Sequence, residues 1–133
     1  MSEANKAVVK RYFEEIWSKA NFSVLPEVTG YEKERMDRLQ QGVSRMHAAF
    51  PDIKYTVQEL VAEGDQIMSY WTATGTHKGE FRGVPATGKP INYRGFDLYR
   101  LSGGKIVERF GGFNDDLMLL QHIGAVTPPE QSR

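Results

Sequence analysis

Apolar side chains recur at helical spacing near the start of the chain. Between residues 3 and 20 they return every three or four positions, with Lys and Glu on the opposite face. This pattern predicts an amphipathic helix, which Ser2 can cap. The next apolar run, 22–25, predicts a short turn that ends at Pro26. The apolar positions of the helix are Val8, Val9, Tyr12, Phe13, Ile16 and Trp17.

The period changes from helix to strand after Phe50. A second helix is predicted over 30–50 from its apolar stripe, and Pro51 ends it. Residues 53–114 then alternate between apolar and polar positions and are rich in β-branched and aromatic residues, which indicates strands. Turns at Gly64-Asp65 and Gly103-Gly104 indicate hairpins. The predicted strands are 53–57, 67–76, 91–101 and 106–113.

A short helix is predicted over 115–123, with Gly124 as its left-handed stop, and a frayed tail over 126–133. Helices followed by an antiparallel meander indicate the α+β class, with the helices packed on one face of a curved sheet. Such a sheet wrapped over helices would enclose a small-molecule cavity. Residues 1–133 are expected to form a single domain.

Composition and charge exclude several classes of function. The chain of 133 residues has 17 basic and 17 acidic side chains, scattered along its length, so we expect no nucleic-acid partner. The absence of cysteine excludes disulfides and thiolate chemistry. No segment approaches the ~20 apolar residues of a membrane span, and the N-terminal segment lacks the apolar core of a secretory signal. We therefore expect a cytoplasmic protein with no membrane partner. The three histidines have no metal-binding spacing, so we predict no metal site.

A set of short motifs follows the first helix in a fixed order. They are Ala-Ala-Phe-Pro-Asp at 48–52, Val-Ala-Glu-Gly-Asp at 61–65, Gly-Thr-His-Lys-Gly at 75–79, Gly-Val-Pro-Ala-Thr-Gly-Lys at 83–89, Gly-Lys-Ile-Val-Glu at 104–108 and Leu-Leu-Gln-His-Ile-Gly at 119–124. In this order they resemble the SnoaL-like polyketide cyclases, also called ester cyclases, of the nuclear transport factor 2-like superfamily. The resemblance covers most of the chain.

The resemblance implies a cone-shaped fold and a cofactor-independent enzyme that acts on a small hydrophobic carbonyl compound. In such a reaction a carboxylate removes an acidic proton next to a carbonyl group, and the enolate closes a ring by attacking a second carbonyl. The resemblance also implies a homodimer, formed through the outer face of the sheet. Fold kinship does not determine the substrate. The alternatives are an isomerase or hydrolase that uses the same pocket, or a non-catalytic small-molecule-binding or assembly module.

The family places its aspartate just before the closing helix, and this chain offers two registers for it. Counting back from the Leu-Leu pair of that helix leads to Asp115, whereas counting forward from the preceding strand leads to Asn114. A β-bulge in the glycine-rich end of the strand would absorb the difference. We predict Asp115 as the general acid–base, with Asp116 as the alternative and Asn114 in contact with substrate. From spacing alone, Asp115 would instead be a helix N-cap.

Two further residues on the strands could carry chemistry. His77 shares its strand phase with Trp71, so it would either face inward and donate to a developing enolate or lie exposed at the end of the strand. Asp97 is the alternative buried acid, and we interpret it as the partner of an arginine on a neighbouring strand. Arg100 is expected to pair with Glu108 across the hairpin.

Aromatic residues are the remaining candidates for contact with substrate. Such residues build a core more often than a binding site, but an aromatic-lined cavity would use them. The predicted residues are Tyr12, Trp17, Trp71, Tyr93 and Phe110.

Overall fold

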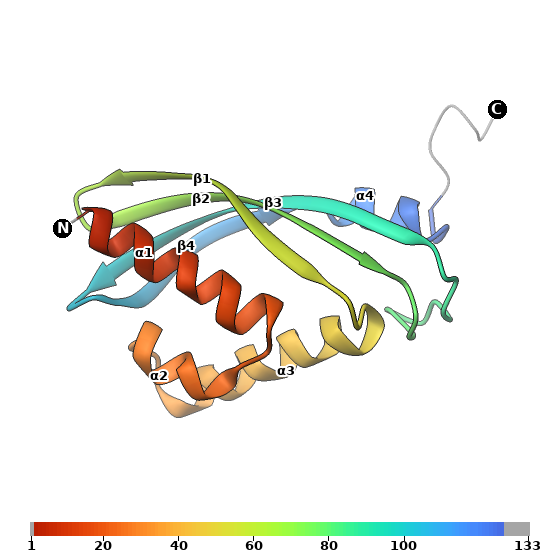
Figure 1. Ribbon diagram of the computed structural model, residues 1–133, viewed down its shortest axis with the longest axis horizontal. Helices are drawn as coiled ribbons and strands as arrows, with labels where there is room; N and C mark the ends of the chain where they lie inside the picture. The colour runs from red at the N-terminus through yellow and green to blue at the C-terminus, as the bar shows by residue number, and fades with distance from the viewer. Residues whose placement is uncertain (1, 127–133) are drawn as a thin grey trace.

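A layer of helices packs beneath a curved four-stranded sheet in the computed structural model, which describes residues 2–126 (Figure 1). The helical elements are α1 (Ser2–Tyr12), the π-helical turn η1 (Phe13–Ser18), the 3-10 turn η2 (Phe22–Val24), α2 (Leu25–Val28), α3 (Lys33–Ala49) and α4 (Asp116–His122). The strands are β1 (Lys54–Glu63), β2 (Gln66–Thr76), β3 (Pro90–Ser102) and β4 (Lys105–Asn114). The α+β class is confirmed. Apart from Val126, the tail predicted over 126–133 lies outside the described residues.

The predicted first helix changes its winding at Phe13. It consists of α1 followed by the π turn η1, and Tyr12, Phe13 and Ile16 around this junction are all buried. Turns of this kind are rare and often lie at functional sites.

The prediction that Pro26 ends a helical turn is wrong, because Pro26 lies in the first turn of α2. Its missing N–H costs no hydrogen bond at that position. No helix in the described residues is long and apolar enough to span a membrane.

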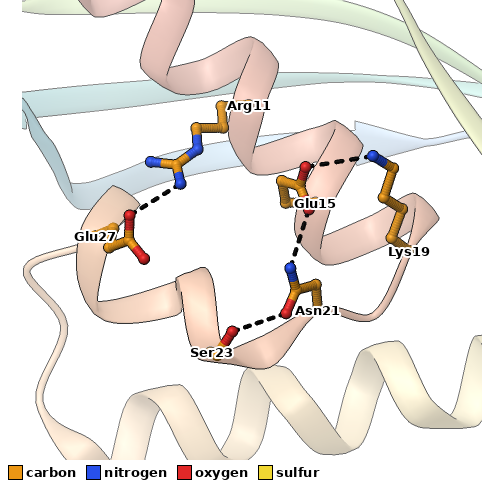
Figure 2. Close-up of polar contacts among 6 residues, drawn as sticks. All are labelled: Arg11, Glu15, Lys19, Asn21, Ser23 and Glu27. Carbon is orange, nitrogen blue, oxygen red and sulfur yellow. Dashed lines mark hydrogen bonds and ion pairs between the residues drawn. The ribbon is translucent and has the colours of Figure 1, made fainter.

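Polar side chains fasten the end of the first helix to the short turns that follow it (Figure 2). Each contact is exposed and contributes little by itself. Together they connect η1 and α1 to η2 and α2, and so restrain the helix that carries the aromatic residues of the inner layer. The contacts are Arg11 to Glu27 at 2.9 Å, Lys19 to Glu15 at 3.3 Å, Asn21 to Glu15 at 3.2 Å and Ser23 to Asn21 at 2.8 Å.

The sheet is an antiparallel meander in the order β1-β2-β3-β4. β1 has one irregularity, at Gln58, and β4 has two, at Val107 and Phe110. Each bulge adds a residue to one strand and bends it, which explains how the sheet curves over α1 and α3 in Figure 1. α4 lies at the end of the sheet farthest from the N-terminus. The concave face and the helices therefore meet around a common interior.

Candidate functional site

A cavity of about 300 Å³ lies between the helices and the concave face of the sheet. Its wall is mostly aromatic, and only a few polar groups interrupt it, which suits a small hydrophobic ligand that carries oxygen atoms. The apolar and aromatic residues of the wall are Tyr12, Phe13, Trp17, Leu39, Met46, Tyr55, Trp71, Phe81, Tyr93, Tyr99 and Leu119.

One polar cluster in the wall is centred on Asp97 of β3. Its Oδ2 accepts a hydrogen bond from Trp71 Nε1 at 2.8 Å, and its Oδ1 accepts from Arg109 Nε at 3.0 Å and Nη2 at 2.6 Å. Asp97 is only 5% exposed, and a buried carboxylate needs such partners. Partial burial opposes the charge of Arg109, but the bonds to Asp97 outweigh it and raise the pKa of the guanidinium. The interpretation of Asp97 as the partner of an arginine is confirmed.

Two glycines provide the space for this cluster. Gly112 is the direct partner of Asp97 in the pairing of β3 with β4. A Cβ atom at Gly112 would overlap the Arg109 guanidinium and the Asp97 carboxylate, and a Cβ atom at Gly95 would overlap the Trp71 indole. The side chains of Arg109 and Trp71 can therefore reach Asp97 only because both positions lack a side chain.

A second polar cluster consists of Tyr55, Tyr93 and Asp116. The two tyrosine hydroxyls are 3.1 Å apart and share one hydrogen bond, so the accepting hydroxyl keeps its own proton for a ligand. Burial raises the pKa of Tyr93 to about 12, and the negative charge of Asp116 adds to the increase. Burial also raises the pKa of Tyr55 well above its usual value. Both hydroxyls are therefore neutral donors at physiological pH.

Arg82 reaches the cavity from a tight turn. Phe81 and Val84 exchange backbone hydrogen bonds of 3.0 and 2.9 Å, which leaves Arg82 and Gly83 as a two-residue hairpin turn with φ angles of 48° and 82°. A left-handed φ is uncommon for arginine and is maintained only where the surroundings stabilise it. The guanidinium lies 4.9 Å from the centre of the Phe81 ring and donates to Asp116 Oδ2 at 3.3 Å. This turn therefore positions a cation beside Asp116.

Asp115 and Asp116 are neighbours with different surroundings. Asp115 is the N-cap of α4: its Oδ1 accepts a hydrogen bond from Met118 N at 3.1 Å, and its Oδ2 lies 3.6 Å from Arg94 Nε. The structure does not place Asp115 in the cavity wall, whereas Asp116 and Asn114 line the wall. The geometry therefore favours the alternative position, Asp116, for an acid–base group.

The structure places His77 outside the cavity wall. It is fully buried, so the exposed orientation is wrong. Its Nδ1 lies 2.9 Å from Thr87 Oγ1, and its ring packs against Phe50 with a centroid separation of 5.6 Å. His77 therefore connects the segment that follows β2 to the end of α3, and it is not among the residues that line the cavity.

Five of the six residues predicted to contact substrate line the cavity, namely Tyr12, Trp17, Trp71, Tyr93 and Asn114. Phe110 does not. It is 48% exposed and borders a shallow depression on the other face of the sheet.

Sequence reasoning did not predict Tyr55, Tyr99, Arg82 or Arg109 as site residues. For the tyrosines a signal existed, because each shares strand phase with a buried neighbour. Arg82 comes from a loop, and Arg109 from a strand whose bulges interrupt the alternation. The described residues bring together no group of three or more His, Asp or Glu side chains that could hold a metal ion.

The comparisons with known proteins agree with this architecture. The family model of the SnoaL-like polyketide cyclases matches residues 7–122. No curated protein matches the chain. Among solved structures, TsrD from Streptomyces laurentii superposes with a TM-score of 0.82 over 95% of this chain and 98% of its own, at 18% identity, which is a likeness of fold alone.

Two further solved structures are proteins proposed to be polyketide cyclases. IdmH from Streptomyces antibioticus has a TM-score of 0.76 at 27% identity and covers 90% of this chain and 98% of its own. A protein from Acidithiobacillus ferrooxidans has a TM-score of 0.79 at 25% identity and covers 92% of this chain and 96% of its own. Since the family model spans most of the sequence, the chain belongs to the SnoaL-like polyketide cyclase family, with a nuclear transport factor 2-like fold.

Proposed function

We propose that the protein catalyses a cofactor-independent, intramolecular aldol-type ring closure of a small hydrophobic carbonyl compound. The observation that carries the proposal is the carboxylate of Asp116 in the wall of an aromatic cavity, beside the hydroxyl pair of Tyr55 and Tyr93. Membership of the family supports cyclase chemistry in general. The roles of individual residues come from the geometry of the cavity.

Asp116 is the proposed general base. One carboxylate oxygen removes a proton from a carbon that lies between two carbonyl groups, and the electron pair of the C–H bond forms the enolate. The enolate carbon then attacks the carbon of a further carbonyl group in the same molecule, which forms the C–C bond of the ring and leaves an alkoxide on that carbon. The new alkoxide takes the proton back from Asp116, so the closure gains and loses no atoms. Such a proton is acidic enough for one positioned carboxylate to remove it.

The hydroxyl pair and Arg82 assist the developing negative charge. The free O–H of the Tyr55–Tyr93 pair can donate to the enolate oxygen, and a preorganised donor of this kind is worth most where water is excluded. Arg82 holds Asp116 in place through the 3.3 Å contact. Asp97 is less suited to act as the base, because three donors already bind its two oxygens.

The test uses a linear probe in which a β-keto ester and a phenyl ketone are joined by a three-carbon chain. Ring closure produces a conjugated aryl enone after loss of water, which is followed by its ultraviolet absorbance. Asp116→Asn removes the proton acceptor and preserves the shape of the side chain. General acid–base groups contribute ~10²- to 10⁴-fold, so we expect a loss of that order in kcat, with little change in KM.

Asp115→Asn is the matched control, because asparagine remains a good N-cap and the side chain lies outside the cavity wall. This variant is expected to retain nearly full activity. Equal activity of wild type and Asp116→Asn would contradict the assignment of the base. An inactive Asp115→Asn beside an active Asp116→Asn would move the base back to Asp115. Ring closure no faster with wild-type protein than in buffer would contradict the proposed reaction.

A further inference from the structure

The Arg109 guanidinium has a nitrogen that faces no protein acceptor. Its Nε and Nη2 both donate to Asp97, and within residues 2–126 no side chain or carbonyl accepts a hydrogen bond from Nη1. Arg109 also lines the cavity. A planar guanidinium that is fixed on one edge presents its other donors in a defined direction. Arg109 can therefore offer a directed N–H to a ligand in the cavity.

The surroundings of Arg109 leave this end of the cavity electrically neutral. Asp97 and Arg109 form a contact pair, so their charges largely cancel for a ligand placed beside both. Burial raises the pKa values of Tyr12, Tyr31 and Tyr99 above their usual values, and the tyrosines are therefore uncharged. Arg35 stacks on the ring of Tyr31 at 3.9 Å but does not line the cavity.

We infer that Arg109 is a specificity-determining residue that binds a neutral oxygen acceptor of the substrate, such as an ester or ketone carbonyl, and that the cavity discriminates against a carboxylate at this position. The inference rests on the proposed function for the nature of the substrate. A neutral carbonyl accepts the free N–H of Arg109. A carboxylate would accept the same N–H but would also lie next to the negative charge of Asp97, whose side chain is only 6% exposed although that of Arg109 is 41% exposed, and this repulsion costs binding free energy.

This subsite and the proposed base lie at different positions along β3. The Asp115 N–H bonds to the carbonyl of Arg94 on β3 at 2.8 Å, which places the start of α4 beside that residue. Asp97 lies three residues farther along the same strand, or about 10 Å at ~3.3 Å per residue. A substrate with its acidic C–H at Asp116 would therefore place the recognised carbonyl at a different position along β3, where Arg109 binds it.

Binding can be tested without turnover, because both tryptophans, Trp17 and Trp71, line the cavity and serve as fluorescent reporters. The probes are methyl para-acetylbenzoate, a neutral ester, and the para-acetylbenzoate anion, which has the same ring and ketone. We expect wild-type protein to bind the ester at least about tenfold more tightly than the anion, because only the anion meets the charge of Asp97.

Asp97→Asn gives the most specific result. It leaves the positive charge of Arg109 uncompensated, so the ratio of the two affinities should move toward the anion by roughly 10- to 100-fold. A general loosening of the structure would weaken both probes alike and would leave the ratio unchanged. Thermal unfolding followed by circular dichroism shows whether the variant is folded. Arg109→Lys is the second variant: it keeps the charges balanced but loses the guanidinium fork, so it should weaken the ester and bring no gain for the anion.

Several outcomes would overturn the inference. They are wild-type protein that binds the anion as tightly as the ester, a folded Asp97→Asn variant with an unchanged ratio, and no detectable binding of the ester at millimolar concentration. Failure of the proposed function is distinguishable from these results. Ring closure by a protein that shows no ester preference would overturn this inference alone. If the protein prefers the ester but Asp116→Asn retains its turnover, Asp116 is not the base, and the inference about Arg109 still holds.

Discussion

At the start of α4, two adjacent aspartates have different neighbours because they occupy different positions of the helix. Asp115 has non-helical backbone angles and turns its carboxylate back to the N–H of Met118. Asp116 is the first residue inside the helix, and side chains of successive helical residues are rotated by about 100° from one another. Its carboxylate therefore leaves the helix toward the cavity. Since the sequence has aspartate at both positions, counting along it could not decide which one lines the cavity.

Asp52 offers a test of stability at the scale of a single residue. Its Oδ1 accepts a hydrogen bond from Thr76 N at 2.7 Å and its Oδ2 accepts from Thr76 Oγ1 at 2.8 Å, and these bonds lower its pKa below the ordinary 3.8. Because folding lowers this pKa, the carboxylate stabilises the fold fully at pH values above its ordinary pKa. This stabilisation is lost as the pH falls through the pKa that Asp52 has in the folded state. Asp52→Asn should therefore lower the free energy of unfolding at neutral pH by about 0.5–1 kcal/mol, a modest figure because the contact is exposed.

Urea denaturation at neutral pH and at about pH 3 checks the prediction. The difference in unfolding free energy between wild type and Asp52→Asn should shrink at the lower pH, because the carboxylate of the unfolded chain binds a proton below its ordinary pKa of 3.8 and the folded carboxylate resists this. Asp65→Asn in the β1–β2 turn is the control, because no hydrogen bond from its side chain occurs in the described structure. If the difference in unfolding free energy between wild type and Asp52→Asn is the same at both pH values, the negative charge of Asp52 does not stabilise the fold.

Among the elements, β4 shows most clearly why the site could be predicted only in part. Simple alternation from the buried Ile106 would turn Phe110 inward, but the bulge at Val107 changes the phase and directs Arg109 inward in its place. The second bulge, at Phe110, changes the phase again, so that Asn114 faces the cavity. A bulge depends on pairing with another strand and has no period of its own in the sequence.

Elements with an uninterrupted period were predicted well. β2 and β3 alternate as expected, and their buried phase includes Trp71, Tyr93 and Asp97. The Arg100–Glu108 pair forms across the hairpin at 3.0 Å, as the strand phases indicated. Periodicity therefore determines which face of a regular strand a residue occupies. It does not reveal contacts that depend on a bulge, a helix cap or a loop such as the one that carries Arg82.

The same strand provides a prediction about packing. Gly112→Ala would drive a methyl group into the Arg109 guanidinium and the Asp97 carboxylate, which face each other across that position. Overpacking of this kind costs about 1–3 kcal/mol, and separation of the buried Asp97 from the half-exposed Arg109 would add to it. We expect the midpoint of thermal unfolding to fall accordingly and the ester preference of the cavity to weaken.

Gly111→Ala is the matched control on the same strand. No atom lies within 4 Å of a Cβ atom built at Gly111, so the added methyl group meets open space. Its effect on the midpoint should be small, and the cavity should keep its ligand preference. Equal destabilisation by the two substitutions would mean that the space required by the ion pair does not explain the effect of Gly112→Ala.

The two faces of the sheet have different surroundings in the whole molecule. The concave face of the sheet meets the helices (Figure 1) and contributes to the cavity wall. The opposite face has exposed aromatic residues. Phe96 is 43% exposed and Phe113 61%, and Phe96 stacks with Tyr70 at a centroid separation of 4.9 Å. An apolar depression on this face is lined by Met68, Phe96, Leu98, Phe110, Gly111, Gly112 and Phe113. Contiguous exposed apolar surface of this kind commonly marks an interface.

We expect this outer face to join two copies of the chain, because a surface around a twofold axis contacts its own equivalent and can bury the same aromatic residues from both sides. Replacing Phe96 and Phe113 by serine should raise the dimer dissociation constant by roughly several hundred-fold or more, since buried aromatic anchors at interfaces contribute about 2 kcal/mol or more each and about 1.4 kcal/mol corresponds to tenfold. Val61→Ser is the control, because Val61 is also exposed, at 59%, but does not line the depression. Sedimentation velocity measures all three proteins. A wild-type chain that sediments as a monomer at about 100 μM, or a Val61→Ser variant that dissociates as readily as the double variant, would show that this face does not form a specific dimer interface.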